Sequence, residues 1–370
     1  MIRSKFMALS FLLLALAAAG MAPASAAEAS AAARGTGPAA FLGPLRLRDM
    51  TPFSLQRLDF LPTAASARYP ENWALEANLE FSNTFIMSRN VADYLEARGT
   101  RAALTGEDFA ALAALPDDAF YFDGTTSVLN LTVHRAINDD WTVYGILPLH
   151  HYTGGFLDST IESFHDAAGF DDFGRPLVAR DAFQAFFKLG EAQSMLTDVP
   201  RTNALADPVI GGRWRGLALG DWDVVVELAA KLPWGADVPF FSSGHADTGV
   251  QVSWQRLWSR DGLFFSVSGV YFGGSDNFGK AVNRFIPGAN VAWEHRIADN
   301  GLSSVLQLSL SRSLFAAGTD PELAANQVQL SAGLRWQQER WHFTFALTEN
   351  VINFANTADI GFHAGLGWSL

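Results

Sequence analysis

The sequence has 370 residues, of which 49% are hydrophobic and only 17% are charged, against about 25% charged residues in soluble domains. It contains 38 acidic and 26 basic side chains, and the net charge of −12 argues against nucleic-acid binding through a basic surface. Cysteine is absent, which excludes disulfide bonds, Fe–S clusters, thiolate zinc sites and cysteine nucleophiles.

The first 26 residues have the pattern of a secretory signal peptide. Arg3 and Lys5 precede an apolar run over residues 6–19, and small residues then lead to Ala26. The run is shorter than the roughly 20 residues that a membrane-spanning helix needs. We therefore expect export of the chain and cleavage after Ala26.

From Trp73 onward, apolar and polar residues alternate with period two, which is typical of strands with two different faces. Such segments cover residues 73–85, 129–134, 141–149, 210–215, 222–232, 250–258, 263–271, 285–297, 306–311, 327–337, 341–348 and 360–370. They predict twelve strands, an even number, as in single-chain bacterial outer-membrane barrels.

The connections between these strands alternate in length. Short turns at residues 138–140, 216–221, 259–262, 298–301 and 338–340 alternate with longer loops, such as 88–120 and 152–205. Short periplasmic turns and long extracellular loops are the arrangement of outer-membrane barrels.

Tryptophan supplies a further argument for a membrane barrel. Ten of the eleven Trp residues fall on the apolar face, in the half of the strands nearer the short turns. Since Trp prefers the membrane interface, we predict an interfacial girdle, whereas a soluble β-sandwich would give no reason for this segregation. The predicted girdle consists of Trp73, Trp141, Trp214, Trp222, Trp258, Trp293, Trp336, Trp341 and Trp368.

These patterns predict an all-β protein. Residues 71–370 are expected to form a transmembrane antiparallel β-barrel of 12 strands, with long extracellular loops that contain short helices. Ser159 to Glu162 fits a helix-capping box, with Gly169 as a stop. Residues 183–187 suggest a second short helix, and the segment from Thr105 to Pro116 a third.

Residues 27–70 have no clean period and are interrupted by four prolines. They are expected to be irregular, because proline disfavours long helices and central strands. Two interpretations stay open. The segment is either a periplasmic tail or a plug whose arginines meet Glu76, Glu80 and Glu227 inside the barrel.

The polar face of the predicted strands carries charges of both signs. A barrel of twelve strands lies between those with a filled interior and those with an open channel, so we expect a narrow or plugged lumen. The same groups could instead pair only to make the barrel rigid. The candidate lumen-lining residues are Glu76, Glu80, His134, Arg213, Arg215, Glu227, Lys231, Glu294, Arg296, Arg335, His342 and His363.

The sequence contains no nucleophile elbow, P-loop, dinucleotide-binding fingerprint or metalloprotease motif. The eight histidines are dispersed, and His150 and His151 point to opposite faces of one strand. We therefore predict no catalytic residues, no metal site and no cofactor.

Several segments resemble an uncharacterised family of Gram-negative outer-membrane β-barrels known as domain of unknown function 3187. The most specific part is the loop Gly154-Gly155-Phe156-Leu157-Asp158 to Gly174-Arg175; Asp207-Pro208 and Lys231-Leu232-Pro233 extend it. Trp234 stands where the family usually has Thr. The later segments are loosely similar to barrels proposed to import aromatic compounds. The resemblance implies the fold and an outer-membrane location, but no activity.

The leading functional hypothesis is a non-enzymatic, narrow passive channel for a small solute in the outer membrane of a Gram-negative bacterium. The alternatives are a lipid-modifying outer-membrane enzyme and a structural or adhesive surface barrel. The expected partners are outer-membrane lipids and the solute, with no nucleic acid. The outer-membrane assembly machinery is a further expected partner, because the apolar C-terminal strand ending at Leu370 resembles its recognition signal.

Overall fold

The computed structural model describes residues 41–64, 73–169, 171–199, 203–234, 240–352 and 356–369. The predicted signal peptide, residues 1–26, lies outside the described residues, as do residues 27–40 and 65–70 of the irregular N-terminal segment.

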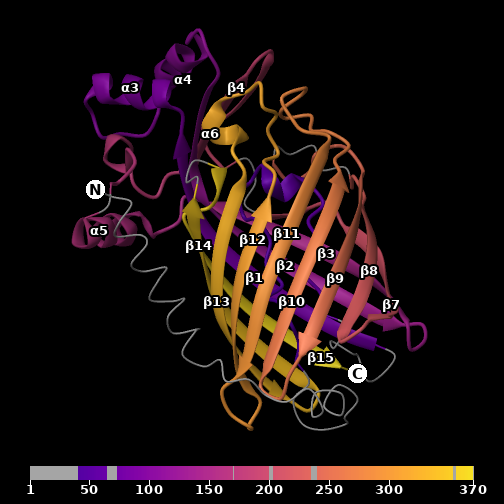
Figure 1. Cartoon of the computed structure of the whole chain (residues 1–370). Helices are drawn as coiled ribbons and strands as arrows, with labels where there is room; N and C mark the ends of the chain where they lie inside the picture. The colour runs from indigo at the N-terminus through magenta and orange to yellow at the C-terminus, as the bar shows by residue number, and fades with distance from the viewer. Residues whose placement is uncertain are drawn as a thin grey trace.

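Twelve antiparallel strands form a closed barrel, which confirms the predicted fold class (Figure 1). β1 pairs with β2 on one side and with β15 on the other. From β15 the neighbouring strands follow in reverse chain order to β7, and β3 closes the barrel by pairing with both β7 and β2. The barrel strands are β1 (Trp73–Met87), β2 (Ala119–Ala136), β3 (Trp141–Thr153), β7 (Val209–Leu219), β8 (Trp222–Lys231), β9 (Asp247–Leu257), β10 (Asp261–Tyr271), β11 (Phe285–Arg296), β12 (Leu302–Ser311), β13 (Gln327–Gln338), β14 (Trp341–Ile352) and β15 (Ile360–Ser369).

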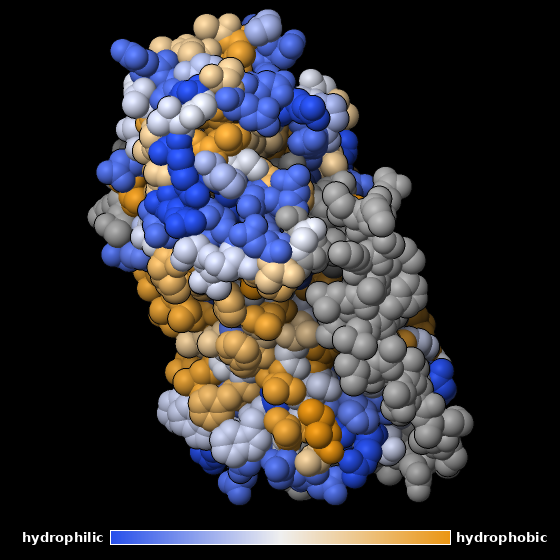
Figure 2. All heavy atoms as spheres, turned by 90° about the vertical axis from the view of Figure 1, so that its left-hand side faces the viewer, coloured by the Kyte–Doolittle hydropathy of each residue, from blue (hydrophilic) through white to orange (hydrophobic). Residues whose placement is uncertain are grey.

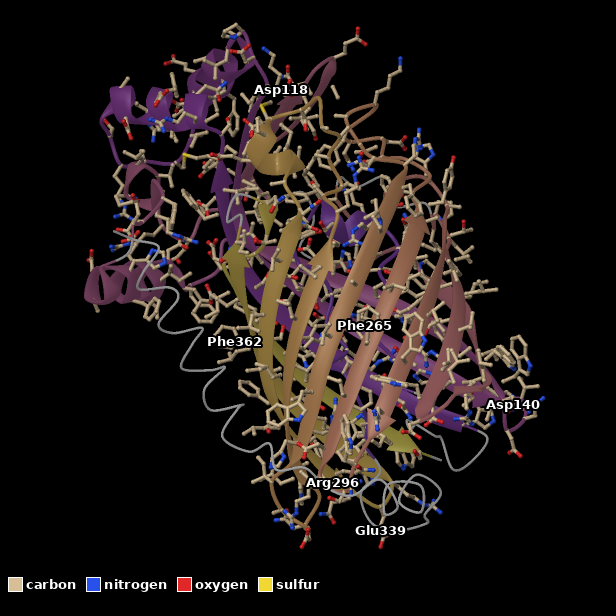
Figure 3. The ribbon with its side chains drawn as sticks, viewed as in Figure 1. Asp118, Asp140, Phe265, Arg296, Glu339 and Phe362 are labelled. Carbon is tan, nitrogen blue, oxygen red and sulfur yellow. The ribbon has the colours of Figure 1, made fainter. Side chains whose placement is uncertain are left out.

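The two ends of the barrel differ in the connections that they carry. Short turns join β2 to β3, β7 to β8, β9 to β10, β11 to β12 and β13 to β14 at one end, here the turn end. The longer connections gather at the opposite end, here the loop end. Asp140 and Glu339 mark the turn end in Figure 3, and Asp118 marks the loop end.

The alternation in sequence corresponds to the two faces of the barrel wall. In β1, Leu79 is 47% exposed on the outside, whereas the next residue, Glu80, is 2% exposed on the inside. Phe265 and Phe362 lie on the outer wall (Figure 3). Apolar residues form a band across the barrel below the hydrophilic loop end (Figure 2). An apolar belt around a wall whose strands are all paired is what hydrocarbon requires of a spanning structure.

Additional elements pack at the loop end, where β1 and β2 extend above the belt (Figure 1). Phe85 and Tyr121 face outward there, but both are buried in a core that includes Val91, Leu95 and Phe109. The strand ends thus act as the floor of a small loop-end domain. The additional elements are α3 (Arg89–Arg98), α4 (Gly106–Ala113), α5 (Asp158–Ala168), α6 (Pro321–Ala324), the 3-10 turn η2 (Arg175–Leu177), β4 (Gln184–Leu189), β5 (Ala192–Leu196) and β6 (Asn203–Leu205).

Two of the three predicted loop helices are present. Thr105 caps α4, because its side chain accepts from the Asp108 backbone N–H while the Asp108 carboxylate accepts from the Thr105 backbone N–H. α5 ends at Gly169, which takes a left-handed conformation (φ 70°) as predicted.

Two details of the loop predictions are wrong. The predicted capping box does not form, because α5 begins after Leu157 and has no side-chain cap. Residues 183–187 do not form a helix, since β4 pairs there with the first residues of β2. In this strand Phe186 packs into the outer core and Phe187 into the barrel interior. Burial on two opposite sides needs the two-residue period of a strand.

Residues 41–64, here the inner segment, lie inside the barrel (Figure 1). The segment is irregular apart from one 3-10 turn, η1 (Ser54–Gln56), and most of it is buried. Within the described residues, no helix is both long enough and apolar enough to cross a membrane.

Candidate functional site

The barrel lumen and the inner segment together form the candidate site. The backbone N–H groups of Gly43, Leu45 and Leu58 donate to side chains of Glu294, Gln307 and Asp247, at 2.7 Å each. An irregular segment has no ladder of its own to satisfy its buried N–H groups. The inward-facing carboxylates and amides of the strands supply those partners instead.

Near the turn end, a charged pair holds the start of the inner segment. Arg335 of β13 lies 3.1 Å from Glu294 of β11 and donates to the carbonyl oxygens of Gly43 at 2.9 Å and Pro44 at 3.2 Å. Arg296 lies over the ring of Phe41, 4.1 Å from its centroid. The segment is thus gripped at its first described residues from two strands.

A second charged group runs across β1, β2, β7 and β8. Arg46 of the inner segment pairs with Glu76 at 2.7 Å, and Glu76 also lies 3.3 Å from His134. Arg213 contacts His134 at 3.3 Å and pairs with Glu227 at 2.9 Å. All five side chains are largely removed from solvent. Their charges are compensated inside the group, because each charged side chain lies beside one of opposite charge.

Midway along the segment, the contacts involve both backbone and side chains. The Arg48 N–H donates to Glu80 at 3.1 Å. Lys231 of β8 donates to the Gln56 carbonyl oxygen at 2.6 Å and pairs with Asp207 at 3.0 Å and Asp247 at 3.4 Å. A buried ammonium with two carboxylates and one carbonyl is well satisfied. This cluster fixes the η1 turn against β8 and β9.

Aromatic rings close the lumen toward the loop end. Phe53, just before η1, is fully buried and lies 5.2 Å from Phe315 and 6.3 Å from Phe187, between ring centroids. Phe278 in turn lies 5.3 Å from Phe187 and 5.0 Å from Phe315. We call Phe53, Phe187, Phe240, Phe278 and Phe315 the aromatic cap. Four of its rings come from outer loops, and the inner segment supplies the fifth.

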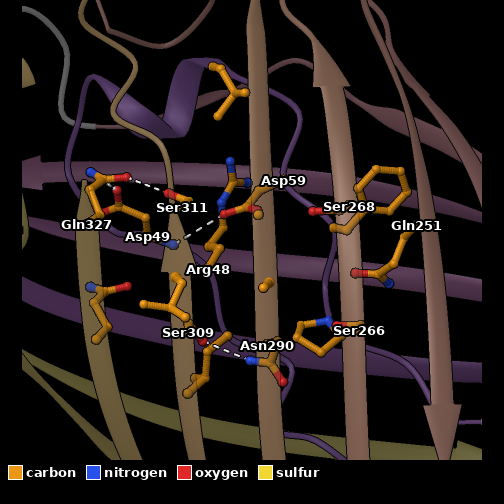
Figure 4. Close-up of a pocket in the computed structure, with 18 of the residues that line it drawn as sticks. Arg48, Asp49, Asp59, Gln251, Ser266, Ser268, Asn290, Ser309, Ser311 and Gln327 are labelled. Atoms are coloured by element: carbon orange, nitrogen blue, oxygen red, sulfur yellow. Dashed lines mark hydrogen bonds between the residues drawn. The ribbon is translucent and has the colours of Figure 1, made fainter. Parts of the chain in front are cut away.

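The cavities that the described residues line in the lumen are small. A cavity of about 70 Å³ lies between the inner segment and strands β9 to β14 (Figure 4). Two further cavities beside the segment measure about 10 Å³ each. One water molecule needs about 10–15 Å³ by this kind of measure. These three spaces therefore suit single waters or a few, and none of them holds a larger solute with the inner segment in this position.

Most of the predicted lumen-lining residues face the interior. His342 and Arg296 are half-buried near the turn end. Arg215 lies apart from the others, because β7 shifts register between Trp214 and Leu217 and Arg215 instead donates to the Asp139 carbonyl at the β2–β3 turn. The buried, inward-facing members are Glu76, Glu80, His134, Arg213, Glu227, Lys231, Glu294, Arg335 and His363.

The predicted Trp girdle residues lie on the outer face near the turn end. Trp341 and Trp368 are register partners with parallel rings 5.0 Å apart. Trp141 and Trp214 are also register partners, but their rings are tilted by 34° at 6.4 Å. Trp73 is 41% exposed and stacks under the Arg135 guanidinium.

Three features of the site were not predicted from the sequence. They are the aromatic cap, the hydrogen bonds of the inner segment to the strands, and the part of the neutral polar side chains in lining the lumen, since these were assigned to the polar face but not named as candidate lumen-lining residues. The phenylalanine-rich loops were a signal for the first. Among the described residues, no three metal-ligating side chains are grouped as a metal site.

Comparison with solved structures finds barrels of outer-membrane channels and porins. The outer membrane channel COG4313 from Pseudomonas putida F1 is 9% identical over 81% of this chain and 96% of that chain, with a TM-score of 0.47. The KdgM porin is 5% identical over 68% and 96%, with a TM-score of 0.37. The monoaromatic hydrocarbon channel TodX, in a deletion mutant, is 9% identical over 81% and 91%, with a TM-score of 0.36.

Comparison with curated proteins gives no match. A family model described as "Protein of unknown function (DUF3187)" matches residues 96–369, which include all barrel strands but β1 and the loop-end domain from the last turn of α3 onward. The chain therefore belongs to the DUF3187 family of proteins of unknown function.

Proposed function

We propose that the protein is an outer-membrane channel through which a small solute passes when the inner segment moves from the lumen. The observation that carries this proposal is the kind of contact that holds the segment. Its backbone is bound by carboxylates, amides and cations of the strands. Water can replace such partners when the segment leaves, and the lumen that remains is lined by polar groups that water wets.

The closure at the loop end depends on the same segment. Phe53 lies between rings of the outer loops, and the Gln56 side chain accepts from Ser275 at 2.9 Å and Asn277 at 2.8 Å. Withdrawal of the segment therefore removes the obstruction in the lumen and one ring of the aromatic cap together. This coupling supports one gate rather than two independent ones.

Planar-bilayer conductance and liposome swelling test the proposal. The full chain is expected to show rare openings, and a variant lacking residues 41–64 should be open for most of the time. Retention of the folded barrel is checked by the gel mobility of unheated and heated samples. If a folded barrel stays closed to ions and small solutes both with and without the segment, the channel function is wrong.

The same preparation separates the channel from the enzyme alternative. If the protein is a channel, the refolded protein should hydrolyse no phospholipid or lipopolysaccharide acyl ester above the rate of a vesicle blank. A rate that depends on protein concentration would favour the lipid-modifying enzyme.

A further inference from the structure

The inner wall of the barrel is chemically divided. Charged side chains line β1, β2, β7 and β8, and they occupy the turn end of β11 and β13. Between that level and Asp247 at the loop end of β9, the inner face of β9 to β14 at the cavity carries hydroxyl and amide side chains without a formal charge, and this surface is here called the neutral wall. Its members at the cavity include Gln251, Ser266, Ser268, Asn290, Ser309 and Gln329.

The charges of the inner segment that border this cavity are already engaged. Arg57 pairs with Asp59 at 3.4 Å, and Asp49 accepts from Thr51 at 3.0 Å and from Gln327. Arg48 donates to the carbonyl oxygens of Leu55 and Arg57, at 3.2 and 3.3 Å. These two cations and two anions cancel, so the cavity offers no excess of either sign to a solute.

The neutral wall also has hydrogen-bonding capacity to spare. Gln251 is 3% exposed, and its side-chain nitrogen has no hydrogen-bond partner among the described residues. Gln251 lies on the cavity beside Ser266 and Ser268, and Asn290 donates to Ser309 at 2.8 Å (Figure 4). A buried amide donor left without a partner is costly, and it points to a ligand group that accepts.

We propose that the neutral wall is the surface along which the solute moves, and that this solute is an uncharged molecule rich in hydroxyl groups. The inference rests on the proposed channel function. Amide and hydroxyl groups both donate and accept, so they replace the hydration of a polyol or sugar at each step. A charged solute would lose hydration in the narrow lumen and meet no countercharge on this wall.

Matched solutes of equal carbon number provide the test. Vesicles with the full-length protein are challenged with glucose, gluconate and protonated glucosamine, and swelling rates are corrected for protein-free vesicles. The neutral sugar is expected to enter about fivefold faster than either ion.

Variants that place a charge on the neutral wall test the route through the ion selectivity of the channel. Ser309→Asp should shift the reversal potential toward cation selectivity, and Ser309→Lys toward anion selectivity, because each places one uncompensated charge on the route. Ser304→Asp lies on the outward face of the same strand and serves as the control, with no shift expected.

The outcomes separate this inference from the channel function itself. Faster entry of either ion, or a Ser309 variant with the selectivity of the unaltered protein, overturns the neutral route and leaves the channel standing. Absence of all flux, including from barrels lacking residues 41–64, overturns the channel and the route with it.

Discussion

At the scale of single residues, Arg175 holds the loop-end domain to the barrel. Its guanidinium donates to Asp158 at 2.8 Å and Asn83 at 2.7 Å, and it pairs with Asp359 before β15. It also lies over the ring of Phe85, 4.8 Å from the centroid. One buried cation thus joins the α5 loop, β1 and β15.

Replacing this cation should loosen the α5 loop. Arg175→Ala leaves two carboxylates without their countercharge, and loss of one partner from a buried pair costs about 3–5 kcal/mol. We expect faster hydrogen exchange and proteolysis of residues 154–181 in a barrel that is still folded. Arg89→Ala is the control, since the Arg89–Asp93 pair is exposed and such pairs contribute about 0–1 kcal/mol. Equal protection in the two variants would contradict this role.

The pKa of Glu162 in α5 predicts how the stability of the same loop changes in acid. Burial tends to raise its pKa, but the hydrogen bonds and charges of Arg180 and Arg101 outweigh burial and hold the pKa below the usual 4.5. A carboxylate with a depressed pKa stabilises the fold above its unfolded value and loses that contribution as the pH falls through the folded value.

The α5 loop should therefore stay protected from protease at neutral pH and open as the pH falls below 4.5. Glu162→Gln should weaken protection at neutral pH and flatten the pH profile, whereas Glu107→Gln, an exposed position on α4, should leave it unchanged. A pH profile that persists in Glu162→Gln would assign the acid response to another group.

The sequence predicted the charged residues of the lumen better than the neutral ones. A charge on the polar face of a strand is unusual enough to attract attention, and nine of the predicted side chains are buried inside. Serine and glutamine on that face look like ordinary solvated residues, so they were placed on the polar face but not among the candidate lumen-lining residues. Arg215 followed the period but lies beyond a register shift, which alternation alone cannot reveal.

At the scale of elements, strands were predictable because each separates two environments. The inner segment had no such signal. Its N–H groups bond to strand side chains far away in sequence, as Gly43 does to Glu294, so its own residues follow no period. β4 was mistaken for a helix because three phenylalanines within five residues fit either period.

The inner segment predicts a gating effect at one ring. Phe53→Ala removes the ring that the segment adds to the aromatic cap, and truncating a buried Phe costs about 3–5 kcal/mol of packing. We expect a higher open probability in planar bilayers with unchanged heat-modifiable gel mobility. Phe156→Ala, at a position 67% exposed on the outside, should match the unaltered protein. Identical gating in both variants would mean that the cap does not depend on the segment.

At the scale of the whole molecule, the interior changes character along the barrel axis. Ion pairs grip the inner segment near the turn end, the neutral wall borders the midsection, and the aromatic cap covers the loop end. The outside is simpler, with an apolar belt between two hydrophilic ends (Figure 2). The two-residue period of the sequence accounts for the apolar outer surface. It does not account for the packing of the lumen, where segments distant in the chain contact one another.

The distribution of tryptophan predicts the position of the barrel in a bilayer. The register pairs Trp341–Trp368 and Trp141–Trp214 lie at the turn end, where a membrane interface would hold their apolar rings while their N–H groups reach water. In vesicles, lipids brominated near the headgroups should therefore quench the tryptophan fluorescence more strongly than lipids brominated near the bilayer centre. Replacing Trp234, which lies outside the strands and is 62% exposed, should leave that depth profile unchanged. Strongest quenching from the bilayer centre would place the girdle in the hydrocarbon and contradict the proposed orientation.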